Sequence, residues 1–85
     1  MHLTNENKER FINFYEIVCN EMIQKNPEKK SHYQRLMEEA NNYCIFPLVV
    51  NMADLIMDNI EILDLATVKE YICMTKLFGV KHFSF

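Results

Sequence analysis

Apolar side chains recur every three or four residues along most of the chain, which is the period of an amphipathic helix. The first such pattern predicts a helix over residues 5–25, with Thr4 placed to cap its first turn. Its apolar face consists of Phe11, Phe14, Tyr15, Val18 and Met22. Ile17 is the exception, because it lies among the polar positions of the opposite face.

Two prolines mark the next helix starts. Asn26 and Pro27 fit an N-cap followed by the first helical position, where proline loses no helical hydrogen bond. This predicts a second helix from Pro27 to about residue 44. Its inward positions are Tyr33, Leu36, Met37, Ala40 and Cys44. Pro47 then permits a third helix over about residues 47–63.

A fourth helix is expected over residues 65–78, after Asp64 as N-cap and before Gly79, which suits the left-handed C′ position. This helix carries two apolar strips, a pattern typical of a helix with two neighbours. One strip consists of Val68, Tyr71, Ile72 and Phe78, and the other of Ala66, Cys73 and Leu77. Residues 80–85 alternate weakly between apolar and polar, and their conformation is left open.

The third helix is apolar almost all round. On a helical wheel its polar residues fall within about 80° of one another. They are Asn51, Asp54, Asp58 and Glu61. An ordinary surface helix needs an apolar stripe of only about 100°. The third helix is therefore either the central helix of the bundle or part of a subunit interface.

Together these patterns predict an all-α fold, a single-domain bundle of about four helices over residues 1–85 with short connections. The 85 residues, 49% hydrophobic and 25% charged, can form one modest core and are globular rather than disordered. The expected core includes Phe14, Val18, Leu36, Ile56 and Ile72.

The sequence offers little that would support catalysis. Its single glycine argues against a phosphate-binding loop or a nucleophile elbow. Asp54 and Asp58 share a helix face but have no basic or histidine neighbour on that helix, so we interpret them as a solvated edge. The histidines and cysteines lack the local spacing of a metal site, and the cysteines are expected to be buried, inert thiols. These residues are His2, His32, His82, Cys19, Cys44 and Cys73. We expect no enzyme activity, cofactor or metal.

Targeting signals are equally sparse. The first residues lack the basic start and apolar run of a signal peptide. Three widely spaced cysteines do not make a disulfide framework. The apolar stretch over residues 45–63 contains three acids, which makes it a poor membrane helix. We therefore expect a cytoplasmic protein that makes no membrane contact.

The net charge of -3 argues against a protein that binds nucleic acid mainly through phosphate contacts. A basic patch is nevertheless predicted where the first helix gives way to the second. It comprises Lys25, Lys29, Lys30 and Arg35. Such a patch suits an acidic partner or, in the runner-up hypothesis, the phosphates bound by a dimeric DNA-binding transcriptional regulator.

The excess of apolar helical surface favours a non-catalytic protein-protein interaction module, a small regulator or inhibitor that binds another protein. The composition, rich in Asn, Lys and Ile, resembles in general style that of small regulators encoded by phages or mobile elements. Symmetric pairing is the simplest way to cover the surplus apolar strips, so the sequence also predicts a homodimer. The expected contact residues are Ile17, Val50, Met57, Ala66 and Met74.

Overall fold

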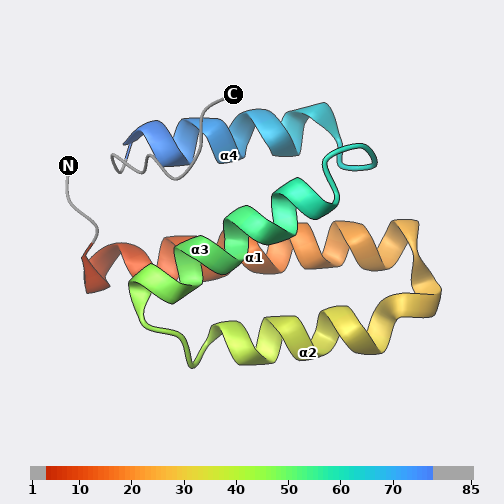
Figure 1. Ribbon diagram of the computed structural model, residues 1–85, viewed down its shortest axis with the longest axis horizontal. Helices are drawn as coiled ribbons and strands as arrows, with labels where there is room; N and C mark the ends of the chain where they lie inside the picture. Colours follow the sequence, from red (N-terminus) through yellow and green to blue (C-terminus); the bar gives the residue numbers. More distant parts are fainter. Residues whose placement is uncertain (1–3, 78–85) are drawn as a thin grey trace.

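The computed structural model describes residues 4–77, which form four α-helices and one short 3₁₀ turn (Figure 1). These are α1 (Asn5–Lys25), η1 (Pro27–Lys29), α2 (Lys30–Ala40), α3 (Ile45–Asp58) and α4 (Leu65–Leu77). The expected all-α bundle is confirmed, and both bounds of the first helix agree with the sequence. The expected helix end at residue 78, the role of Gly79 and the segment 80–85 lie outside the described residues.

Helices α2, α3 and α4 lie on three sides of α1. None of these three is enclosed by the others. In Figure 1, α2 runs antiparallel to α1 on one flank, α4 lies along the opposite flank, and α3 crosses in front of α1. Helix α1 packs against both α2 and α3, and Phe14 of α1 stacks on Tyr71 of α4 with ring centroids 6.3 Å apart. The backbone spans only 16 Å along its shortest axis, about two helix layers. In so thin a molecule α3 keeps an outer side.

Helix α2 ends four residues before the predicted position, at Ala40. The side-chain amide of Asn41 donates to the Met37 carbonyl oxygen at 3.1 Å, and the backbone N–H of Tyr43 donates to the Ala40 carbonyl oxygen. Asparagine side chains compete in this way with the helical ladder. The predicted continuation to residue 44 is therefore wrong.

Helix α3 begins and ends earlier than predicted. Pro47 is its third residue rather than its first, which is allowed because the first N–H groups of a helix have no helical acceptor. Its end at Asp58 follows from Asn59, whose side chain donates to the Leu55 carbonyl oxygen at 2.8 Å. The backbone N–H groups of Ile62 and Leu63 then donate to the Asn59 carbonyl oxygen. The predicted end at residue 63 is thus five residues too late.

The core lies where α1 meets the other three helices. Phe14, Val18 and Ile56 are buried as predicted, whereas Leu36 and Ile72 are only partly buried. Helix α4 turns a different face inward from the predicted apolar strips. Its buried residues are Thr67, Tyr71, Met74 and Thr75. Contacts with α1 select this face, because Thr67 donates to Glu21 and Tyr71 stacks on Phe14.

Candidate interaction surface

Helix α3 has three distinct faces. One is buried in the core and comprises Ile45, Leu48, Val49, Met52, Ala53, Leu55 and Ile56. The solvent side divides into two halves. One half is polar, formed by Asn51, Asp54 and Asp58. The other half is apolar and remains exposed. Only part of the apolar surface of this helix is therefore buried in the core.

The exposed apolar half forms a straight stripe, which we call the α3 seam. It consists of Phe46, Val50, Ala53 and Met57, whose spacing of four, three and four residues keeps them within about 60° around the helix. Phe46 is 61% exposed, Val50 46% and Met57 45%, while Ala53 between them is buried at the edge of the core. The seam spans about 17 Å along the helix axis.

Two of these residues, Val50 and Met57, were expected contact residues, and the structure places both on one stripe. Phe46 was missed. The predicted helix began at Pro47, one residue too late to include it, although its spacing of four residues from Val50 is the signal that identifies it. The early start of α3 therefore lengthens the stripe by one helical turn.

The seam continues past the end of α3. Met57 and Ile62 line a shallow depression of about 300 Å³ together with Asp58 and Glu61. Ile62 is 48% exposed. Apolar surface is therefore continuous from the helix into the loop that follows it, and two carboxylates stand at its edge.

The acids beside the seam make no ion pair with any residue between 4 and 77. Asp54 lies one helical turn after Val50 and one turn before Met57. Lys29 and His32 share a groove with Asp54 and Asp58 between α2 and α3, but neither approaches them closely enough for an ion pair. The seam is thus bordered by carboxylates that form no ion pair within residues 4–77.

The other expected contact residues are not part of this surface. Ile17 is exposed and lines a separate depression between α1 and α4 with Phe14, Cys73 and Met74. Ala66 is exposed on α4. Met74 is only 6% exposed, so little of its side chain is accessible, and its predicted role as a contact residue stays a prediction. It lies on the face of α4 that the Phe14–Tyr71 contact turns towards α1.

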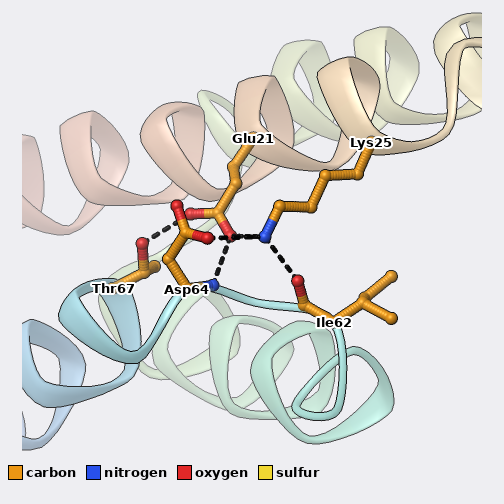
Figure 2. Close-up of polar contacts among 5 residues, drawn as sticks. All are labelled: Glu21, Lys25, Ile62, Asp64 and Thr67. Carbon is orange, nitrogen blue, oxygen red and sulfur yellow. Dashed lines mark hydrogen bonds and ion pairs between the residues drawn. The ribbon is translucent and has the colours of Figure 1, made fainter.

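Lys25 of the predicted basic patch forms hydrogen bonds and ion pairs within the molecule. The Lys25 ammonium donates to Asp64 Oδ1 at 2.8 Å, to Glu21 Oε2 at 3.1 Å and to the carbonyl oxygen of Ile62 (Figure 2). The hydrogen bond to Asp64 is the main reason that the pKa of Lys25 is raised. Ile62 and Asp64 lie 37 and 39 residues away in the chain, so local sequence patterns do not reveal these two contacts.

Glu21 completes this network at the start of α4. Its carboxylate accepts the backbone N–H of Asp64 at 2.7 Å and the hydroxyl of Thr67 (Figure 2). Burial raises the pKa of Glu21, but the hydrogen bonds from Thr67, Asp64 and Lys25 outweigh burial and lower it. A negative group at a helix N-terminus also interacts favourably with the helix dipole. The network is structural, because it fixes α4 and the 59–64 loop to α1.

Lys29, Lys30 and Arg35 remain exposed. On the helical wheel they point in directions that differ by about 100° or more, so they do not form one basic surface. The runner-up hypothesis of a DNA-binding regulator stays a prediction. Retention on a heparin column at low salt tests it, and Lys30→Glu with Arg35→Glu is the variant that should abolish retention if it holds.

One of the three cysteines is buried and two are exposed, whereas all three were expected to be buried. Cys19 is buried, and burial, aided by the charge of Glu16, raises the pKa of its thiol to about 12. Cys44 and Cys73 are exposed, so the expectation that they are buried is wrong for both. Cys44 lies at the N-cap of α3 because α2 ends early, and Cys73 lies on the outer face of α4.

Within residues 4–77, no three His, Cys, Asp or Glu side chains converge on a point where a metal ion could bind. None of the helices described there combines the length and the apolar character that a bilayer span requires.

Comparisons with protein-family models, with curated proteins and with solved structures find no match for this chain.

Proposed function

We propose that this protein is a non-catalytic interaction module, a small regulator or inhibitor that binds another protein through the α3 seam. The observation that supports the proposal is the row of large apolar side chains on the solvent side of α3, Phe46, Val50 and Met57. Exposed apolar residues scattered singly need no explanation, but aligned ones mark surfaces that a partner covers.

The seam has the composition of a binding surface rather than of an active site. Aromatic residues and methionine are enriched at protein interfaces, and methionine adapts its shape to what it contacts. Neither thiol exposed in the described part of the chain lies on the seam, and the acids beside it lack a basic or histidine partner on α3.

Affinity capture from extracts of the source cell tests the proposal with matched variants. The native chain is compared with the double variant Val50→Glu/Met57→Glu, which places charge on the seam. Two controls make the same kind of change at other exposed apolar positions: Ile17→Glu on α1 and Leu65→Glu on α4. Circular dichroism and a thermal melt first establish that each variant is folded.

We expect a polypeptide captured by the native chain and by both controls to be lost from the seam variant. Capture that survives Val50→Glu/Met57→Glu but fails with Ile17→Glu would move the binding surface to the α1–α4 depression and contradict the proposal. Equal capture by all four chains would show that no specific apolar surface is used.

A further inference from the structure

The geometry of the seam is that of one half of a coiled-coil contact. Apolar residues alternating at spacings of four and three are the a and d positions of a heptad. In such contacts a side chain of one helix enters a hole between four side chains of the other. Val50, Ala53, Asp54 and Met57 have the spacing that frames such a hole; Ala53 is buried in the core, so Val50, Asp54 and Met57 are the members that face solvent.

One member of that hole is an acid. Asp54 stands on its rim, and Asp58 and Glu61 continue the negative edge along Met57 and Ile62. All three acids are exposed and make no ion pair with any residue in the described part of the chain. In coiled coils the charged residues that flank the apolar seam decide which partner is accepted.

We infer that the α3 seam accepts an amphipathic helix of another protein whose apolar stripe is flanked by lysine or arginine. This inference rests on the proposed function and names its partner class. Apolar side chains of the partner helix pack against Phe46, Val50 and Met57, while a basic side chain beside them reaches Asp54 or Asp58. The apolar contact supplies most of the affinity, and the charge contact supplies selectivity.

We call Asp54, Asp58 and Glu61 the acid edge. Other occupants fit this edge less well. A second copy of this chain would bring its own Asp54 and Asp58 to the contact, and two molecules with a net charge of -3 repel one another at low salt. A nucleic acid or an anionic membrane would likewise meet negative charge beside the seam. A basic helix is the occupant whose charge complements this edge.

Designed peptides test the partner class with purified native chain. The probe is a helix of about 21 residues, long enough to be stable alone, with leucine at a and d and lysine at the flanking positions. One control peptide has glutamate at those flanking positions, and a second has the lysine composition in scrambled order. Binding is measured by fluorescence anisotropy at low salt and at about 1 M salt, where the screening length falls to about 3 Å.

Two double variants of the protein isolate the role of the acid edge. Asp54→Asn/Asp58→Asn removes two charges beside the seam. Glu16→Gln/Glu38→Gln removes two charges from the depression between α1 and α2 and serves as the matched control. The apolar variant Val50→Glu/Met57→Glu tests the seam itself, so failure of the seam and failure of the charge argument are read separately.

We expect the lysine peptide to bind the native chain at least about tenfold more tightly than either control peptide at low salt. The Asp54→Asn/Asp58→Asn variant should bind it about fivefold more weakly, with less salt dependence, while Glu16→Gln/Glu38→Gln stays near native. Equal binding of the lysine and glutamate peptides, or no binding of any peptide, would overturn the inference. A second copy that competes with the peptide for the seam in sedimentation would overturn it as well.

Discussion

Exposure along α3 changes completely between neighbouring side chains. Ile56 has no exposed surface, whereas Met57, one residue later, is nearly half exposed. Successive helical residues point about 100° apart, so a helix on the surface of a thin bundle turns one residue inward and the next outward. The same type of residue therefore stabilises the fold at one position and is available for binding at the next.

This contrast predicts opposite effects of two adjacent substitutions. Ile56→Ala should lower the free energy of unfolding by about 2–5 kcal/mol, because it leaves a cavity in the core. Met57→Ala should change it by less than about 1 kcal/mol, as an exposed side chain buries little on folding. Urea unfolding followed by circular dichroism measures both. A large loss for Met57→Ala would mean that the seam is covered in the isolated chain.

Thiol labelling tests the burial of individual side chains without any substitution. A thiol reagent should modify two cysteines of the native protein, Cys44 and Cys73, and reach Cys19 only after unfolding. Burial both blocks access to Cys19 and raises its pKa to about 12, which keeps it in the unreactive thiol form. Mass spectrometry of the labelled peptides identifies the sites. Rapid labelling of Cys19 in the native state would contradict the packing of α1.

Helix existence was predictable from the sequence, and helix ends were not. The three- and four-residue spacing of apolar side chains located all four helices within the described range, because it reflects the faces that must leave water. The ends of α2 and α3 depend instead on single side-chain hydrogen bonds of Asn41 and Asn59 to preceding carbonyl groups. Whether an asparagine bonds to its own helix is decided by its surroundings, which apolar periodicity does not report.

The candidate surface was half predictable for a related reason. The apolar surplus of the third helix was visible in the sequence, and so were Val50 and Met57 as contact residues. Which apolar residues of α4 stay exposed depends on which face of this helix packs against α1. Thr67 and Tyr71, held by Glu21 and Phe14 of α1, turn Met74 inward and leave Ala66 and Cys73 outside. These contacts join residues more than forty positions apart.

The Glu21 contact predicts how the attachment of α4 depends on pH. Because the pKa of Glu21 is lower in the folded chain than its ordinary value of 4.5, its contribution to stability is complete above about pH 4.5 and is lost as the pH falls through the folded-state value. Glu21→Gln should cost about 1–2 kcal/mol at neutral pH and remove this part of the acid dependence.

Urea unfolding of native, Glu21→Gln and Glu38→Gln chains between pH 3 and pH 7 measures this effect. Glu38 is exposed on α2, and its variant controls for the loss of one charge. Parallel pH profiles for native and Glu21→Gln chains would show that the Glu21 carboxylate does not hold α4 in place.

At the scale of the whole molecule, the thin bundle leaves one side of α3 exposed, and we propose that a partner covers it. The homodimer predicted from the sequence stays a prediction, and sedimentation velocity at micromolar concentration measures it. Of its expected contacts Met74 is buried, and the acids beside the seam oppose symmetric pairing, so the account favours a monomer that binds a different protein.

The most direct test of the central claim is photo-crosslinking from position 46. Replacing Phe46 with a photo-reactive phenylalanine analogue keeps an aromatic side chain at the end of the seam, where it is 61% exposed. Irradiation in extracts of the source cell should join the chain to one other polypeptide, and Val50→Glu/Met57→Glu should abolish the adduct. An adduct that persists in that variant, or that forms equally from position 65 on α4, would contradict binding through the α3 seam.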